Sequence, residues 1–179
     1  MKLEKYSDVV LTSLVNDYRE NFDRQFCRIT TNYKGLKQFE VGFFIDGLPH
    51  LLGLHYVSGI KYGGGIIRAI DNGKITAQGI QKHHEFNKMK IRKRILLYPF
   101  LYETFVDQHI KICVPTENMR PNPQKLECVF TKIDGKGEVV LGLRKDHKDG
   151  IYKPATLYPA SKQKYTLMRC SKVESIIWN

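Results

Sequence analysis

The sequence predicts an α+β fold in a single domain over residues 1–179, in which N-terminal helices precede a largely antiparallel sheet. A length of 179 residues corresponds to one domain of ordinary size. A hydrophobic content of 42% is enough to build a packed core. After Gln108 the apolar residues change from spacings of three and four to alternation, which is typical of strands.

The first half of the chain carries mostly helical patterns. Leu11, Leu14 and Tyr18 belong to one apolar stripe, which predicts an amphipathic helix over residues 7–23 with Ser7 as its N-cap. Pro49 favours the first turn of a short helix. The other expected elements are strands over 25–31 and 38–45, a Gly-rich surface loop over 57–73, a helix from Thr76 to residue 84, and a helix over 88–107 that Pro99 kinks or interrupts.

The second half of the chain is dominated by strand patterns. Asp134-Gly135-Lys136-Gly137 has the composition of a hairpin turn between two strands. The alternating segments predict strands over residues 109–114, 126–133, 138–144, 155–158, 164–170 and 173–178.

The chain is strongly basic, and its basic residues are unevenly distributed. Lys and Arg total 29 against 18 Asp and Glu, giving a net charge of +11 that favours polyanionic partners. Residues 82–94 hold six basic groups and only Glu85, and residues 144–172 hold eight against two acidic ones. Such segregation is typical of a surface that binds RNA or DNA, although a merely well-solvated surface would give the same count.

Several other classes of protein are disfavoured. The four cysteines include no C-x-x-C pair, so we expect free, mostly buried thiols in a reducing compartment. His50 and His55 are five residues apart, whereas paired metal ligands on a helix are four apart, so we expect no metal and no other cofactor. No apolar run approaches the roughly 20 residues of a membrane helix, and no signal segment follows Met1, so we expect a cytoplasmic protein.

The segment from Leu48 to His55 is the most informative part of the chain. It places His50 and His55 in an apolar stretch directly after a strand. Because RNA supplies its own nucleophile, the 2′-OH, metal-free cleavage needs only a base, an acid and cations for the developing charge. A dipole at the first helical turn would keep His50 neutral, which suits a base. The alternative is that both histidines are structural residues of the core.

The C-terminal segment from Lys153 to Tyr165 interleaves aromatic, hydroxyl and cationic side chains. Tyrosine rings can stack on bases, and Ser161 and Lys162 can bind a phosphate. The alternative is a proline-bounded loop between two strands.

Four elements together resemble a phage- and prophage-associated branch of the barnase–EndoU–colicin–RelE nuclease superfamily. Members of that branch carry an H-L-x-G-L-H signature after an N-terminal helix, which residues 50–55 match closely. A Lys-containing helix, an Arg-Ile helix and a Tyr/Pro/Ser element then follow. Here they are echoed, in the same order, by residues 80–86 with Lys82, by Arg94-Ile95, and by Tyr158-Pro159-Ala160-Ser161. One departure is His83, which stands where the branch has a hydroxyl residue.

The resemblance implies a compact RNase-like fold with a metal-independent active site on the sheet face. It also implies a role as a toxin or effector in conflict between phage, mobile element and host. By position, it assigns functional roles to His50, His55, Lys82 and Ser161.

We therefore expect a metal-independent endoribonuclease that leaves a 2′,3′-cyclic phosphate. The base is His50 or His55, and the acid is the other of the two or His84. The expected partners are RNA, such as tRNA or mRNA, and an acidic antitoxin or immunity protein. The alternative class is a non-catalytic nucleic-acid-binding or inhibitor protein from a phage or mobile element, which would not need the histidines. The remaining residues expected to bind phosphate or orient RNA are Lys82, Arg94, Arg144, Lys162, Ser161, Tyr158 and Tyr165.

Overall fold

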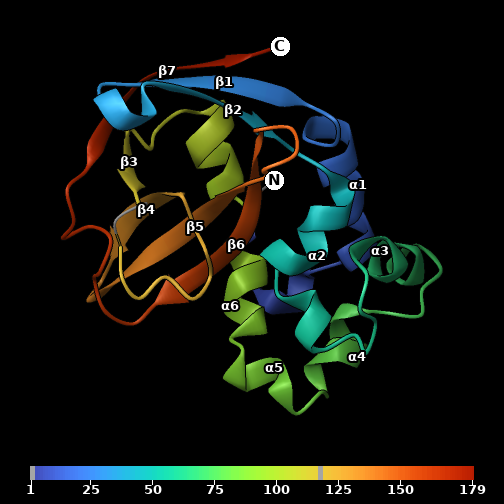
Figure 1. Ribbon diagram of the computed structural model, residues 1–179. Coiled ribbons are helices and arrows are strands. Elements are labelled where there is room, and N and C mark those ends of the chain that lie inside the picture. The colour runs from blue at the N-terminus through green and yellow to red at the C-terminus, as the bar shows by residue number, and fades with distance from the viewer. Residues whose placement is uncertain (1–2, 117–118) are drawn as a thin grey trace.

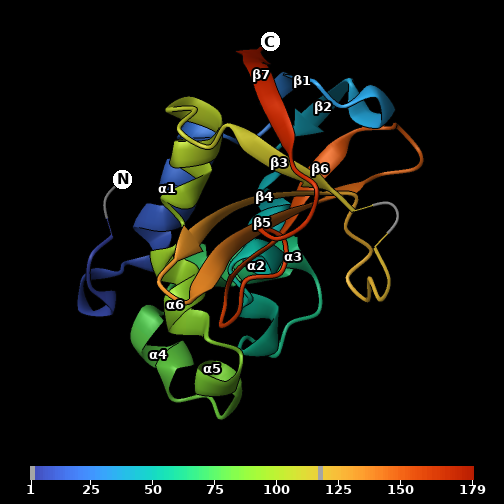
Figure 2. The ribbon, with the colours of Figure 1, turned by 90° about the vertical axis from the view of Figure 1, so that its left-hand side faces the viewer.

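The computed structural model describes residues 3–116 and 119–179 as a seven-stranded closed sheet with most of its helices gathered beside one end (Figures 1 and 2). The α+β class predicted from the sequence is confirmed. The strands are β1 (Phe26–Thr31), β2 (Gln38–Gly42), β3 (Ile112–Pro115), β4 (Cys128–Asp134), β5 (Gly137–Lys145), β6 (Tyr152–Ala160) and β7 (Ser171–Trp178).

The strands close into a barrel in the order β1-β2-β6-β5-β4-β3-β7. Neighbouring strands are antiparallel except β2 and β6, which are parallel and joined through the pair Val41 and Tyr152. The largely antiparallel sheet is thus confirmed, and so is the hairpin turn between β4 and β5, where Gly135 has a φ of 59°. Barrel closure, in which β7 pairs with both β1 and β3, goes beyond what the sequence pattern predicted.

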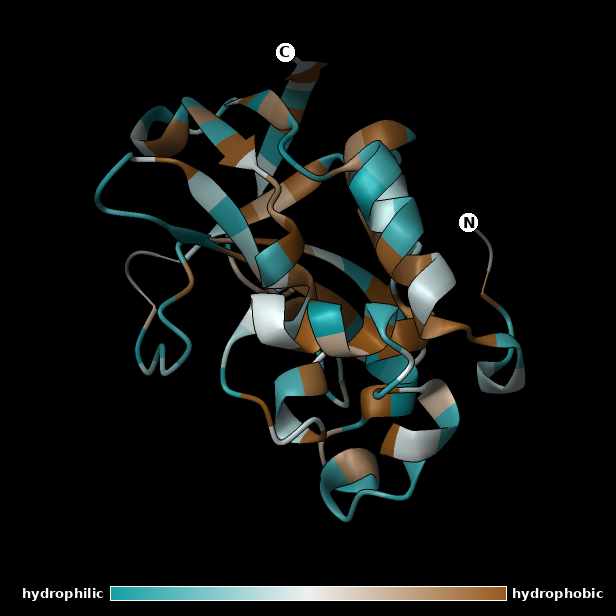
Figure 3. Ribbon diagram, turned by 90° about the vertical axis from the view of Figure 1, so that its right-hand side faces the viewer, coloured by the Kyte–Doolittle hydropathy of each residue, from teal (hydrophilic) through white to brown (hydrophobic). Residues whose placement is uncertain are grey.

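The helices are short, and hydrophobic and hydrophilic residues alternate along them (Figure 3). They are α1 (Leu11–Asn21), α2 (Leu48–Leu51), α3 (Gly63–Asp71), α4 (Ala77–Gln81), α5 (Glu85–Lys88) and α6 (Ile91–Leu96). Single 3₁₀ turns are η1 (Tyr6–Asp8), η2 (Lys34–Leu36), η3 (Ile45–Gly47) and η4 (Leu54–Tyr56), and η5 (Tyr102–Val106) is π-helical. Among the described residues, no helix combines the length and apolar character needed to span a membrane.

The N-terminal helix begins later than predicted. The expected N-cap, Ser7, lies in η1, and its hydroxyl donates to the Asp8 carboxylate instead of capping a helix. Val9 and Val10 are extended, and Val9 is buried in the core, so α1 starts only at Leu11. Two β-branched residues in an extended conformation separate the turn from the helix, as their restricted side chains favour.

The Gly-rich region 57–73 contains a helix, so the prediction of a surface loop throughout was wrong. Ile66, Ile67 and Ile70 of α3 are buried and supply the apolar face. Gly63 is needed for close packing, because a Cβ there would lie 1.9 Å from the Asp46 carbonyl oxygen. The glycines therefore allow contact with η3, and the apolar stripe stabilises the helix.

Two other segments differ from the prediction. Residues 88–107 are not one helix, because Lys90 is left-handed with a φ of 54° and the chain turns again at 97–99, where Pro99 interrupts it as predicted. Residues 164–170 form no strand. The backbone N–H groups of Lys164, Tyr165 and Thr166 donate to the Glu138 carboxylate and so cannot join a ladder.

One large hydrophobic core joins the helices to the barrel interior. The ring of Phe105 packs 4.9 Å from that of Phe43 and 5.5 Å from that of Phe130, centroid to centroid. A smaller cluster lies on the other face of β4 and β5, where Tyr165 and Leu126 cover Val140. Cys27, Cys113 and Cys128 are buried free thiols and Cys170 is exposed, as expected for cysteines without disulfides.

Candidate active site

The segment after β2 brings His50 and His55 together. His50 lies in the single turn of α2, and His55 lies in η4. Gly53 separates the two elements with a left-handed φ of 74°, a conformation that glycine adopts without strain. The chain reversal places the two imidazole rings 4.5 Å apart between centroids, at an interplanar angle of 36°.

Arg94 of α6 packs directly against this turn. A Cβ at position 53 would lie 2.9 Å from Arg94 Cδ and 2.9 Å from Ile91 Cδ1. The absence of a side chain at Gly53 therefore leaves room for the Arg94 side chain. Arg94 Nε donates to the Met89 carbonyl at 3.0 Å, and Nη1 donates to the Leu157 carbonyl at 3.2 Å. These contacts fix the guanidinium between α6 and β6. Burial lowers the pKa of Arg94, which nonetheless remains a cation near neutral pH.

The histidine pair and Arg94 open onto a pocket of about 700 Å³, which we call the histidine pocket. One wall comes from α2 and η4, and the other from the ends of β5 and β6 with the turn between them. The wall contributed by residues 144–156 is rich in cations. The polar side chains that line the pocket are His50, His55, Tyr56, Arg94, Gln124, Arg144, Lys145, Asp146, His147, Lys148, Lys153 and Thr156.

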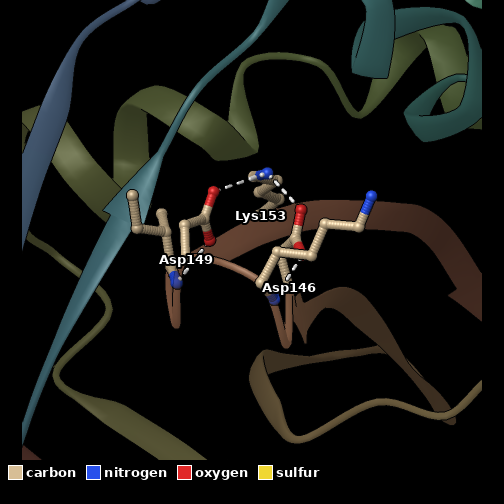
Figure 4. A network of polar contacts seen from close by, with 5 residues as sticks. Asp146, Asp149 and Lys153 are labelled. Carbon is tan, nitrogen blue, oxygen red and sulfur yellow. Dashed lines mark hydrogen bonds and ion pairs between the residues drawn. The ribbon is translucent and has the colours of Figure 1, made fainter.

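A small ion-pair network holds the turn between β5 and β6 (Figure 4). Lys153 Nζ lies 2.7 Å from Asp146 Oδ2 and 3.2 Å from Asp149 Oδ2. The backbone N–H groups of Lys148 and Ile151 donate to the same two carboxylates. The pKa of Asp146 is lowered, mainly by the hydrogen bond that Lys153 donates to its carboxylate. This arrangement neutralises the carboxylate that lines the pocket and leaves Arg94, Arg144, Lys145 and Lys148 as excess positive charge.

The electrostatics of the pocket act most strongly on His55. Burial, the charge of His50 and that of Arg94 lower the pKa of His55 to about 4, against the opposing effect of the Pro49 backbone. Its Nδ1 is buried and makes no hydrogen bond within the described part of the chain. His55 is therefore a neutral imidazole near pH 7. The helix dipole that was expected to act on His50 would come from α2, which is only four residues long.

Arg94 also lines a second pocket of about 420 Å³, which we call the lysine pocket. Glu138 lines it, but the side chain is only 1% exposed. Burial and a hydrogen bond with Tyr165 raise the pKa of Tyr158, whose ring also faces Arg94 at 5.6 Å. The lining comprises Lys88, Met89, Lys90, Arg94, Glu138, Tyr158, Pro159, Ala160, Ser161, Lys162, Lys164 and Tyr165.

The residues predicted from the sequence thus divide into three groups. The histidine pocket holds His50, His55, Arg94 and Arg144. The lysine pocket holds Tyr158, Ser161, Lys162 and Tyr165, again with Arg94. Lys82 and His84 line neither of these two described pockets: Lys82 is an exposed residue after α4, and His84 is exposed and pairs with Glu85 at 3.6 Å.

Sequence reasoning missed part of the histidine pocket. Tyr56, directly after His55, is 39% exposed and presents an aromatic ring to the pocket. Lys145 comes from the end of β5, Lys148 from the turn that follows it, and Lys153 from the start of β6. The charge-rich string at 144–153 was the available signal, but its position opposite the histidines depends on the β5–β6 pairing. Among the described residues, no three His, Cys, Asp or Glu side chains form a group that could hold a metal ion.

Comparison with known proteins assigns the chain to a family. The model of the family described as phage-Barnase-EndoU-ColicinE5/D-RelE like nuclease 4 matches residues 11–178. No curated protein and no solved structure matches the chain. The family match covers nearly the whole sequence and confirms the resemblance drawn from the four sequence elements. The chain belongs to the phage-Barnase-EndoU-ColicinE5/D-RelE like nuclease 4 family.

Proposed function

We propose that this protein is a metal-independent endoribonuclease whose active site is the histidine pocket. The observation that carries the proposal is the pair His50 and His55, with rings 4.5 Å apart, in a pocket bordered by Arg94 and Arg144. A proton donor, a proton acceptor and fixed cations are the groups that 2′-OH attack on a phosphodiester requires.

In this proposal His55 is the general base. Its lowered pKa keeps the imidazole neutral near pH 7, so it can accept the 2′-OH proton. His50 is the general acid. A proton on His50 disfavours a second one on His55, because the two charges would repel at this ring distance. The pair therefore divides into one donor and one acceptor.

The reaction then balances without any other reactant. The 2′-oxygen bonds to phosphorus as its proton passes to His55, and the bond from phosphorus to the 5′-oxygen breaks as His50 donates a proton to that oxygen. The products are a 2′,3′-cyclic phosphate and a 5′-hydroxyl end. Arg94 and Arg144 stabilise the charge on the crowded phosphate, and Tyr56 stacks on a base.

We further propose that cleavage serves a toxin or effector role in conflict between phage, mobile element and host. The family description joins phage-encoded, colicin-like and RelE-like nucleases in one name. A net charge of +11 would suit RNA, and an acidic antitoxin or immunity protein would cover the same basic surface. Induced expression should arrest growth of a bacterial host, and His50→Ala/His55→Ala should abolish the arrest.

The decisive experiment is a cleavage assay with total RNA and tRNA in excess EDTA, followed by analysis of the 3′ ends. Wild-type protein should give discrete products with cyclic phosphate, and His50→Ala or His55→Ala should lower the rate by about 100-fold or more. The matched control is His109→Ala, which removes an exposed histidine that lines neither described pocket.

The outcomes separate the nuclease from the alternative class. If wild-type protein binds RNA in a salt-dependent way but cleaves none, the non-catalytic binding or inhibitor hypothesis is correct and both histidines are structural. If RNA is cleaved equally by wild type and both single variants, the nuclease hypothesis stands but the histidine pocket is the wrong site.

A further inference from the structure

We infer that the lysine pocket is a subsite for the neighbouring nucleotide of the same strand, so that the substrate is a single-stranded polynucleotide spanning both pockets. The inference rests on the proposed function of the histidine pocket. A substrate must then contain at least two nucleotides to occupy both pockets.

Arg94 connects the two pockets. Its guanidinium lines both, and its hydrogen bonds to the carbonyls of Met89 and Leu157 hold it at their common border. A phosphate that links two consecutive nucleotides can contact this guanidinium while each nucleotide occupies one pocket. An arginine fixed by backbone contacts is well suited to that position, because little side-chain freedom is lost on binding.

The charge of the lysine pocket favours an anion. Lys88, Lys90, Lys162 and Lys164 line it in addition to Arg94. Lys162 follows β6 in an exposed bend, and Lys164 Nζ lies 5.3 Å from the centroid of the Tyr165 ring. Lys88 pairs with Glu85 at 3.1 Å, which leaves three lysines and the shared arginine as excess positive charge. They surround a space large enough for a small ligand, since such sites occupy about 300–1,000 Å³.

Glu138 is the one carboxylate among the described residues that line this pocket. It orders the neighbouring loop, and the hydrogen bonds that it accepts compensate the charge of the carboxylate. Oε1 accepts hydrogen bonds from the backbone N–H groups of Lys164 and Tyr165, each at 2.9 Å. Oε2 accepts from the Thr166 N–H at 2.9 Å and from the Thr131 hydroxyl at 3.3 Å. With both oxygens engaged and the side chain 1% exposed, Glu138 fixes the 164–166 backbone. The backbone that carries Lys164 is thus ordered before a ligand binds, which lowers the cost of ordering the loop.

The concave shape of both pockets favours a single strand over a duplex. A base can enter a pocket only when it is unstacked and unpaired, which is far easier in a single-stranded loop or end than in a helix. The pockets differ in chemistry: the histidines line only one of them, and the lysine pocket offers cations and the Ser161 hydroxyl. The first therefore performs the reaction and the second binds.

The test measures binding of 2′-O-methyl RNA, which lacks the free nucleophile, by fluorescence anisotropy over a range of salt concentrations. The probes are a mononucleotide, which the histidine pocket alone can hold, and a hexanucleotide, which spans both pockets. Wild type should bind the hexanucleotide more tightly. Lys162→Ala/Lys164→Ala should weaken hexanucleotide binding about tenfold, leave the mononucleotide nearly unchanged, and reduce the slope of log K against log salt by about 0.7 for each phosphate that the variant no longer neutralises. The matched control, Lys34→Ala/Lys37→Ala, removes two exposed lysines from the β1–β2 turn.

Because binding is the readout, failure of this inference differs from failure of the proposed function. Equal losses for both double variants, or an unchanged salt slope, would overturn the subsite even if RNA is cleaved. Tighter binding of a hexanucleotide duplex than of the single strand would overturn the single-strand assignment. An inactive protein that still shows the length-dependent loss would retain the subsite and refute the nuclease.

Discussion

Replacing His55 with glutamine should make the stability of the protein less sensitive to acid. The pKa of this imidazole is lowered to about 4, first by burial and then by the nearby charges of His50 and Arg94. A histidine in the unfolded chain has a pKa of about 6.5. Below pH 6.5 the unfolded state therefore binds a proton that the folded state resists, so stability falls as the pH falls from about 6.5 toward 4.

The magnitude follows from these two values. Integrating the proton-binding difference from pH 7 to pH 5 gives a loss of about 2 kcal/mol in the free energy of unfolding. His55 is only about half buried, so solvent screening reduces this figure to about 1 kcal/mol. Wild type should show this loss of stability in acid. His55→Gln should not show it, because a glutamine side chain does not bind a proton.

Urea unfolding at pH 5, 6 and 7 would measure the effect. The difference in free energy of unfolding between wild type and His55→Gln should change by about 1 kcal/mol across that range, in the direction of relative stabilisation of the variant in acid. His109→Gln controls for replacing an exposed histidine. If the curves for wild type and His55→Gln run parallel with pH, His55 does not have a lowered pKa and the assignment of the base loses its support.

Two further perturbations test the supports of the two pockets. Gly53→Ala should destabilise the fold by about 1–3 kcal/mol in urea unfolding and slow RNA cleavage, because an alanine is strained in the left-handed conformation and its Cβ would meet Arg94. Gly73→Ala is the matched control, with a φ of 69° and no atom within 4 Å of a Cβ; an equal effect on cleavage would refute the role of the Arg94 contact. Glu138→Gln should cost about 2 kcal/mol at pH 7 in the same assay. Burial acts to raise the pKa of Glu138, but hydrogen bonds from three backbone N–H groups lower it overall. The carboxylate therefore stabilises the fold above about pH 4.5, and this stabilisation is lost as the pH falls through the folded pKa. Wild type and variant should therefore converge in acid, and a constant difference, or an equal loss in the exposed Glu174→Gln, would contradict the reasoning.

Local sequence patterns predicted most of the strands and the histidine pair. Alternation after Gln108 identified β4 and β5, and two histidines in an apolar stretch after a strand identified one wall of the pocket. These features depend on residues close together in the chain. The helix α3 was missed because its glycines resemble a loop, whereas Gly63 serves close packing against Asp46.

The other wall of the histidine pocket could not be predicted from local patterns. Its position opposite His55 follows from the pairing of β5 with β6, in which Arg144 faces Lys153, and from the ion pairs that hold the intervening turn. The loop at 164–170 was predicted as a strand because its alternation was visible, while its partner, the Glu138 carboxylate, is 26 residues away in sequence. Long-range contacts of this kind have no signature in a short window.

The position of β7 in the barrel means that the sheet closes only at the end of synthesis. Since β7 pairs with both β1 and β3, the sheet cannot close until the last strand has left the ribosome. A nascent chain that ends before residue 171 already carries both histidines, Arg94 and the lysines of both pockets, yet β1 and β3 present unpaired edges. All the residues that line the two pockets are therefore synthesised before the strand that closes the barrel around the core.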